Sequence, residues 1–136
     1  MTLEPLFFQQ LDVFIENALQ EDAPQGDRTS LACIPAEARC NAQLLVKDAG
    51  ILAGVEVAHR IFKKVDPQSV FTTLIEDGTH VSFGEIAFHV ECNTRALLRA
   101  ERVALNIMQR LSGIATLAHE FKFEVEDLPV KILDTR

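Results

Sequence analysis

Four arginines and one asparagine recur at helical spacing in the stretch RALLRAERVALNIMQR. They are Arg95, Arg99, Arg102, Asn106 and Arg110, separated by steps of four, three, four and four residues. On a helix these side chains lie along one stripe. A guanidinium group can bind a carboxylate or a phosphate through two parallel hydrogen bonds, so the stripe suits a small polyanion. Charged rows on helices usually face water, and on spacing alone a solvated helix face is the favoured interpretation.

A second candidate is the polar group Asp134, Thr135 and Arg136, which follows the apolar run VKILD. That run, residues 130–134, predicts a buried strand. Polar residues just beyond a buried parallel strand lie at the edge where α/β enzymes build their sites, although an ordinary strand-to-loop transition explains them equally well. A strand needs a pairing partner, so we expect this chain to be incomplete in function.

Metal and thiol chemistry have less support. The loop EDAPQGDRTS places Glu21, Asp22 and Asp27 around Gly26 but lacks the alternating oxygen ligands of a calcium loop, so it predicts helix termination and capping. We therefore predict no metal site. No C-x-x-C pair and no histidine pair at i, i+4 occurs, which favours reduced thiols and assigns no histidine a catalytic role. The cysteines are Cys33, Cys40 and Cys92, and the histidines are His59, His80, His89 and His119.

Composition indicates a globular chain. Of the 136 residues 48% are hydrophobic and 24% are charged, which is enough apolar content to bury a core. The net charge of −7 argues against a nucleic-acid or anionic-membrane partner, because such surfaces need clustered lysine and arginine. The first residues lack a basic stretch, and no apolar run approaches the roughly 18 residues of a membrane span. We expect a cytoplasmic protein.

The candidate arginines need a long helix to hold them. Helical periodicity covers Pro5–Gln20, Val55–Val65 and residues 95–121, the last with Asn93 as N-cap and an interruption at Ser112-Gly113. The predicted apolar face of the long helix consists of Leu97, Leu98, Ala104, Leu105, Met108, Leu111 and Ala115.

Strand patterns fill the intervals. The pattern shortens toward strands from Thr29 to Asp48, most clearly in AQLLVKD, residues 42–48. Residues 70–91 predict two strands joined through turns at Asp77-Gly78 and Phe83-Gly84. The fold class is therefore α+β, with one domain over residues 1–112 and a second beginning at 113–136. The hairpin also resembles biotinyl and lipoyl carrier domains, but it lacks the lysine to which a carrier attaches its cofactor.

The motifs together resemble the quinolinate phosphoribosyltransferase family, the carboxylating nicotinate-nucleotide pyrophosphorylases. The resemblance is carried by AERVALN and LSGIAT in the long helix, followed by LDTR at residues 133–136. EDAPQGDRTS, LLVKDAGILAGVEVA and EDGTHVSFGE fit the same family. It covers nearly the whole chain from Glu21 onward.

This resemblance implies a fold and a reaction. Family members join an N-terminal α/β sandwich to an incomplete α/β barrel, so residues 113–136 would supply the first helix and strand of that barrel. The enzymes combine quinolinate with phosphoribosyl pyrophosphate and Mg²⁺, and they release pyrophosphate and CO₂ to give nicotinate mononucleotide for NAD synthesis. They are homodimers with shared active sites.

The resemblance also implies residue roles. Arg102 would hold a quinolinate carboxylate across the dimer interface, with Glu101 nearby as a catalytic residue, and Arg136 would contact the same substrate. The remaining catalytic groups and the Mg²⁺ ligands would lie outside this chain, so the 136 residues alone are expected to be inactive. Two alternatives stay open: a related phosphoribosyltransferase acting on nicotinate or another acid, and a non-catalytic dimerisation module.

Overall fold

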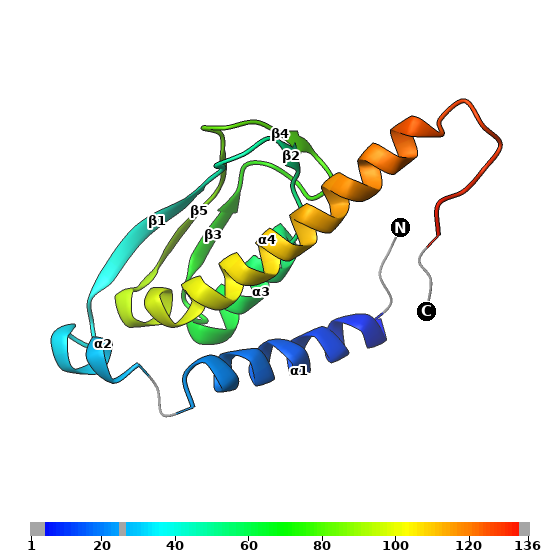
Figure 1. The fold of residues 1–136 in the computed structure, drawn as a ribbon. Helices are drawn as coiled ribbons and strands as arrows, with labels where there is room; N and C mark the ends of the chain where they lie inside the picture. The colour runs from blue at the N-terminus through cyan, green and yellow to red at the C-terminus, as the bar shows by residue number, and fades with distance from the viewer. Residues whose placement is uncertain (1–4, 25–26, 134–136) are drawn as a thin grey trace.

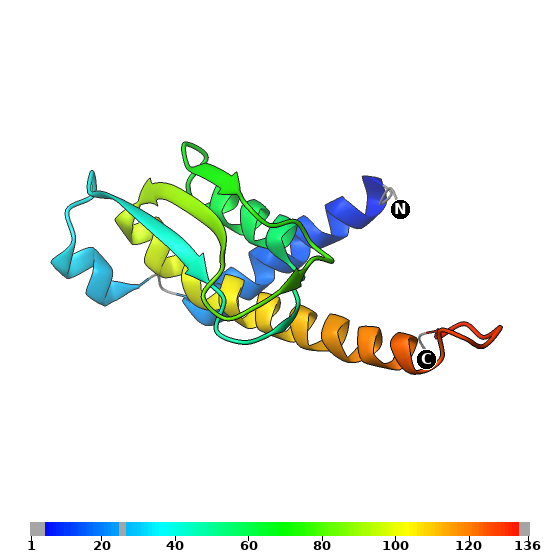
Figure 2. The ribbon, with the colours of Figure 1, turned by 90° about the horizontal axis from the view of Figure 1, so that it is seen from above.

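Helices pack on one face of a small antiparallel sheet in this computed structural model, which describes residues 5–24 and 27–133 (Figure 1). The predicted α+β class is confirmed. Seen from above, the strands lie over α3 and α4, with α1 on the far side of those helices (Figure 2). The elements in chain order are α1 (Pro5–Asp22), α2 (Arg28–Cys33), β1 (Arg39–Leu45), β2 (Gly50–Ile51), α3 (Val55–Val65), β3 (Val70–Thr73), β4 (His80–Val81), β5 (Ile86–Asn93) and α4 (Thr94–Glu124).

The main sheet has the strand order β1-β5-β3, and both pairings are antiparallel. Side chains alternate across its central strand: Phe88, Val90 and Cys92 are buried, whereas His89 and Glu91 face outward. This alternation is expected for a sheet with one covered face. The short strands β2 and β4 pair only with each other and form a second, two-stranded sheet.

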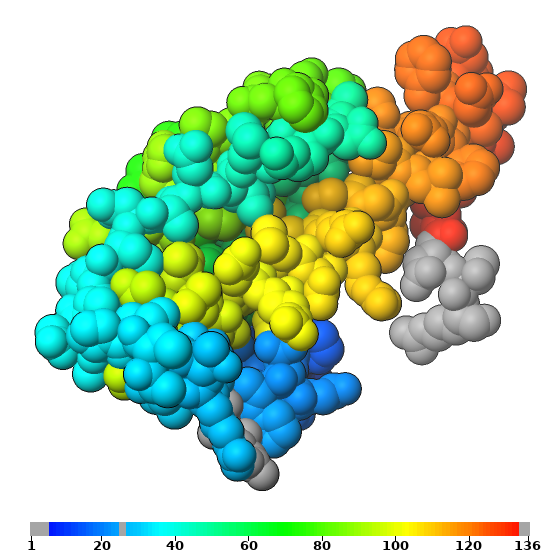
Figure 3. All heavy atoms as spheres, turned by 60° about the vertical axis from the view of Figure 1, so that its left-hand side comes forward, coloured from blue at the N-terminus to red at the C-terminus, as the bar shows by residue number. Residues whose placement is uncertain are grey.

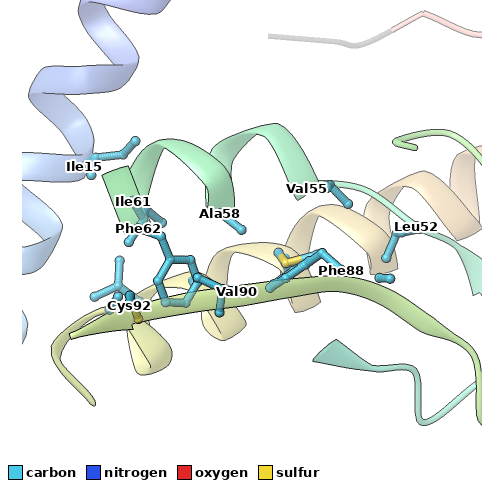
Figure 4. Packing of buried hydrophobic residues seen from close by; sticks show 14 of the residues in the cluster. Ile15, Leu52, Val55, Ala58, Ile61, Phe62, Phe88, Val90 and Cys92 are labelled. Carbon is cyan, nitrogen blue, oxygen red and sulfur yellow. The ribbon is translucent and has the colours of Figure 1, made fainter. Parts of the chain in front are cut away.

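The core lies between the sheet and the helices (Figure 4). Phe62 of α3 and Phe88 of β5 meet with ring centroids 6.3 Å apart, and the ring of Phe71 of β3 lies tilted against Phe88 with centroids 4.4 Å apart. Such aromatic pairs stabilise a core beyond the area they bury. Helix α1 adds Ile15 and Leu19, both almost fully buried, so it belongs to the same core.

Helix α4 packs through a narrower face than the sequence suggested. Its buried residues are Ala100, Val103, Ala104 and Met108. Leu98, Leu105 and Leu111 of the predicted face are 37–42% exposed, so that prediction was wrong at these positions. Small side chains at 100 and 104 let the helix approach the domain closely, and this turns the larger leucines to the flanks.

The predicted interruption at Ser112-Gly113 is also wrong, because α4 runs through it as one helix of 31 residues. The Ser112 hydroxyl accepts a hydrogen bond from the backbone N–H of Ala53 at 2.9 Å and donates one to the Ala53 carbonyl at 3.2 Å. Thr116 accepts a hydrogen bond from the N–H of Ile51 at 2.9 Å and donates its hydroxyl proton to the Ser112 carbonyl. Two side chains of α4 thus form hydrogen bonds with the backbone of residues 51–53, the β2 segment, as a neighbouring strand would.

Glycines make this approach possible. A Cβ on Gly50 would lie 2.5 Å from the Thr116 hydroxyl oxygen, which is too close for any other residue. Gly54 has φ of +100°, and its Cβ would meet Met108 Cγ at 3.1 Å. Position 50 therefore requires glycine for close contact, and position 54 requires it for its backbone conformation.

The predicted helices and turns are confirmed, whereas the predicted strands differ in part from those observed. The helices at Pro5–Gln20 and Val55–Val65 are confirmed, and so are the Asn93 N-cap and the glycine turns at 78 and 84. Residues 28–33 form a helix where strand was predicted, because Asp27 caps the N–H of Ser30. Strand β1, Arg39–Leu45, lies within the stretch predicted as strand and ends three residues before Asp48. The two strands predicted over residues 70–91 correspond to β3 and β5, which pair with each other. Strand β4 lies between them in the sequence but pairs with β2.

The strand expected over residues 130–134 is absent from its described part, Val130–Leu133. No strand lies alongside it among the described residues, and the N–H of Val130 instead bonds the Leu128 carbonyl at 2.8 Å. The predicted boundary at residue 112 falls inside α4, and the division into 1–112 and 113–136 stays a prediction. Within residues 5–24 and 27–133, no helix has both the length and the apolar character to cross a membrane.

A residue distant in sequence caps α3. Gly54 occupies the N-cap position without a side chain, and Asp77 accepts hydrogen bonds from the N–H groups of Val55 at 2.8 Å and Glu56 at 3.3 Å. A carboxylate at a helix N-terminus satisfies free donors and faces the positive end of the helix dipole.

Replacing Asp77 by alanine should therefore lower the free energy of unfolding by about 1 kcal/mol, the usual cost of a lost N-cap. Urea denaturation of the 136-residue chain measures it. Glu76→Ala is the matched control, because it removes the same charge from the neighbouring exposed position. Equal midpoints for Asp77→Ala and the unaltered chain would contradict the capping role.

Candidate functional site

The arginine stripe predicted from spacing lies on the first half of α4, but its members have different surroundings. Arg95 is a structural residue. Its Nε donates to the Ile34 carbonyl at 2.8 Å and its Nη2 donates to the Leu31 carbonyl at 3.1 Å. It thereby satisfies free carbonyls at the end of α2 and is not available for a ligand.

Arg102 is one of the exposed members of the stripe. Its side chain is 74% exposed, and its Nε forms an ion pair with Asp22 Oδ1 at 3.7 Å. In the space-filling view, the first half of α4 (yellow) lies at the surface above α1 (blue) (Figure 3). The ion pair engages Nε and leaves the terminal Nη1 and Nη2 atoms to face a ligand. An exposed fork of this kind suits a planar carboxylate.

Glu101 lies on another side of the same helix. It lines a groove of about 230 Å³ between α4 and the sheet, whose other walls include Gln43, Leu44 and Leu105. Consecutive helical residues are about 100° apart, so Glu101 and Arg102 face different surroundings. The structure therefore does not bring these two predicted site residues together within this chain.

Arg99 lines a hollow of about 430 Å³ near the start of α4, together with Asp27, Asp66 and Asn93. Both carboxylates are held ionised. Hydrogen bonds from the Ser30 hydroxyl and the Ser30 N–H lower the pKa of Asp27. The pKa of Asp66 is lowered chiefly by the hydrogen bond from the Asn93 N–H, despite its burial, with further help from the Gln68 N–H and Arg39. The guanidinium groups of Arg95 and Arg99 line the same hollow, so its two negative and two positive charges balance within the chain.

Asn106 and Arg110 continue the stripe at an open, shallow surface that also includes Gly113, Ile114 and Leu117. All five are exposed. The stripe thus becomes apolar toward the projecting end of α4 (Figure 1). The predicted ligand Arg136 lies outside the described residues.

Asp22 was not predicted as a partner of Arg102, only as part of a possible cation loop. No local pattern links residues that lie 80 positions apart. Among the described residues, no group of three or more histidine, cysteine or acidic side chains is placed to hold a metal ion. All three cysteines are free: Cys33 is exposed, Cys40 is half-buried and Cys92 is buried.

Comparison with protein families gives one clear match. Residues 27–112 match the model for "Quinolinate phosphoribosyl transferase, N-terminal domain", which is well over half of the chain. Among the described residues of this match are Arg99, Glu101 and Arg102; Asp22 lies before it.

Similar proteins agree with that match. A mitochondrial quinolinate phosphoribosyltransferase (decarboxylating) from Nicotiana tabacum is 42% identical over 120 residues, covering 88% of this chain and 34% of the relative. A probable nicotinate-nucleotide pyrophosphorylase (carboxylating) from Synechocystis is 33% identical, covering 93% of the chain and 42% of that protein. The chain thus spans between a third and a half of the length of these relatives.

Solved structures extend the likeness to three dimensions. NadC from Streptococcus pyogenes superposes with a TM-score of 0.91 at 33% identity and covers all of this chain and 47% of its own. The nicotinate-nucleotide pyrophosphorylase of Francisella tularensis superposes with a TM-score of 0.84 at 28% identity over 93% of the chain. The fold is therefore shared along essentially the whole length of the chain.

The lowered pKa of Asp66 predicts how stability changes with acidity. A carboxyl group whose folded pKa lies below the ordinary value of 3.8 stabilises the fold above that value. This contribution is lost as the pH falls through the lower, folded pKa. Asp66→Asn should therefore destabilise the chain at neutral pH, and the gap should narrow progressively below pH 3.8.

Urea midpoints measured across this pH range provide the test. Asp127→Asn is the control, because Asp127 is exposed and changes charge in the same way. A gap between Asp66→Asn and the unaltered chain that stays constant with pH would show that the carboxylate charge is not what stabilises the fold there.

Proposed function

The chain belongs to the quinolinate phosphoribosyltransferase family, and from this we propose that it works as the N-terminal part of an enzyme that joins quinolinate to phosphoribosyl pyrophosphate. The products are nicotinate mononucleotide, pyrophosphate and CO₂. The family match over residues 27–112 is the observation that carries this proposal. The fold likeness to NadC supports it, because the arginine-bearing helix is part of the shared structure.

Arg102 is the proposed substrate-binding residue of this chain. Quinolinate carries two adjacent carboxylates, and the free Nη atoms of Arg102 can bind one of them with two parallel hydrogen bonds. A fixed positive charge beside the substrate also orients the ring nitrogen toward the ribose carbon from which pyrophosphate leaves. It further stabilises negative charge as the 2-carboxylate departs.

Glu101 remains a proposed catalytic residue and Arg136 a proposed substrate contact. Support for Glu101 is its exposed position at the groove between α4 and β1. A ligand held by Arg102 at an open surface needs a second protein surface to exclude water. We accordingly propose a homodimer in which Arg102 completes a site built mainly by the other subunit.

Magnesium is proposed to enter with phosphoribosyl pyrophosphate, whose phosphates bind it. The described residues do not fit a metal site, since they include no suitable cluster of ligands, so no step of the reaction is assigned to the ion here. The proposed location is the cytoplasm. The free cysteines suit a reducing compartment, although the tobacco relative is named as mitochondrial.

Arg102→Ala should weaken quinolinate binding by the full-length enzyme by ~2–5 kcal/mol, the range for truncating one partner of a desolvated charge pair. Steady-state kinetics would show this as a raised KM for quinolinate. Arg110→Ala is the matched control, because it removes an exposed arginine from the same stripe. An unchanged quinolinate KM in Arg102→Ala would contradict the assigned role.

The 136-residue chain by itself should show no phosphoribosyltransferase activity, because the groups proposed to bind phosphoribosyl pyrophosphate are not among its residues. The measurement is pyrophosphate release that depends on quinolinate, with the full-length enzyme as positive control. Release by the isolated chain above the background without quinolinate would refute the expectation.

A further inference from the structure

We propose that Asp22 is a positioning residue for Arg102: its carboxylate fixes the guanidinium so that the Nη fork faces the quinolinate carboxylate. This inference depends on the proposed function, in which Arg102 binds substrate. Asp22 does not itself touch the substrate and acts through Arg102.

The geometry of the ion pair supports this role. Asp22 Oδ1 lies 3.7 Å from Nε, on the inner side of the guanidinium, and the terminal nitrogens stay free. The Asp22 side chain is 26% exposed against 74% for Arg102, so the acid is the less exposed partner. Among the described residues, Asp22 is the only ion-pair partner of Arg102. Holding one long side chain in place before the ligand arrives lowers the entropy cost of binding.

The position of Asp22 in its own helix is a second, independent observation. Asp22 is the last residue of α1, and no basic residue lies in the last turn of that helix. A carboxylate at this end faces the negative pole of the helix dipole and is locally unfavourable. Helix stability therefore does not account for an acid at this place, whereas contact with Arg102 does.

The attachment of α1 to the domain does not account for an acid at position 22 either. Helix α1 is already held by the buried side chains of Ile15 and Leu19. Two further ion pairs join it to α3, from Arg60 to Asp12 at 3.2 Å and from Lys64 to Glu16 at 3.0 Å. Removing the Asp22 charge should therefore leave the docking of α1 intact. This separates a positioning role from a structural one by experiment.

The test compares Asp22→Asn with Glu21→Gln in the full-length enzyme. Glu21 is the neighbouring exposed acid, so its variant changes the net charge equally without touching the ion pair. We expect Asp22→Asn to raise the KM for quinolinate about two- to five-fold, the worth of an exposed ion pair. The KM for phosphoribosyl pyrophosphate, kcat and Tm should stay unchanged, and Glu21→Gln should behave as the unaltered enzyme.

A double variant completes the test. In an Arg102→Ala background, Asp22→Asn should have no further effect on the quinolinate KM, because there is no guanidinium left to position. A lower Tm in Asp22→Asn would indicate a structural role and overturn the proposal. So would an unchanged or lowered quinolinate KM, or an equal effect in both backgrounds. If Arg102→Ala itself leaves that KM unchanged, the proposed function of Arg102 fails first, and the two failures can be told apart.

Discussion

The attachment of α4 to the domain is the constraint on which the candidate site depends, because the helix carries Glu101, Arg102 and the rest of the arginine stripe. Apolar contact holds its first half through Ala100, Val103, Ala104 and Met108. Farther along, hydroxyl groups of Ser112 and Thr116 bond the backbone of the β2 segment. Burial alone fixes the distance of a helix from a sheet, but these directional bonds also fix its rotation and its position along the axis. The direction in which the arginines point follows from that register.

One periodic stripe of arginines serves two purposes. Arg95 donates hydrogen bonds to carbonyl groups at the end of α2, and Arg99 lines a hollow that also contains two ionised carboxylates. Farther along, Arg102 and Arg110 are both exposed, and Arg102 in addition has an acid from another helix beside its Nε. Spacing determines which side chains share a face. What each of them can bind is determined by the neighbours that the fold places beside it.

Sequence periodicity predicted what depends on local interactions. The bounds of α3, the Asn93 cap and the two glycine turns follow from side chains within a few residues of each other. Pairing of β2 with β4 involves two residues on each side and left no pattern to detect. The cap that Asp77 supplies to α3 and the pairing of Asp22 with Arg102 join residues 22 and 80 positions apart. Such contacts are set by packing, so they could be found only in three dimensions.

The backbone and the side chain of Arg102 differ in how they are held. The next two residues, Val103 and Ala104, are buried, so the backbone at this position is fixed in the core. The guanidinium stands at the end of a long flexible side chain that is 74% exposed, so packing restrains it little. An arginine in these surroundings visits many rotamers unless a charge selects one. Because the carboxylate of Asp22 is the less exposed charge and lies beside Nε, the direction in which the guanidinium faces a ligand depends on an acid from another helix.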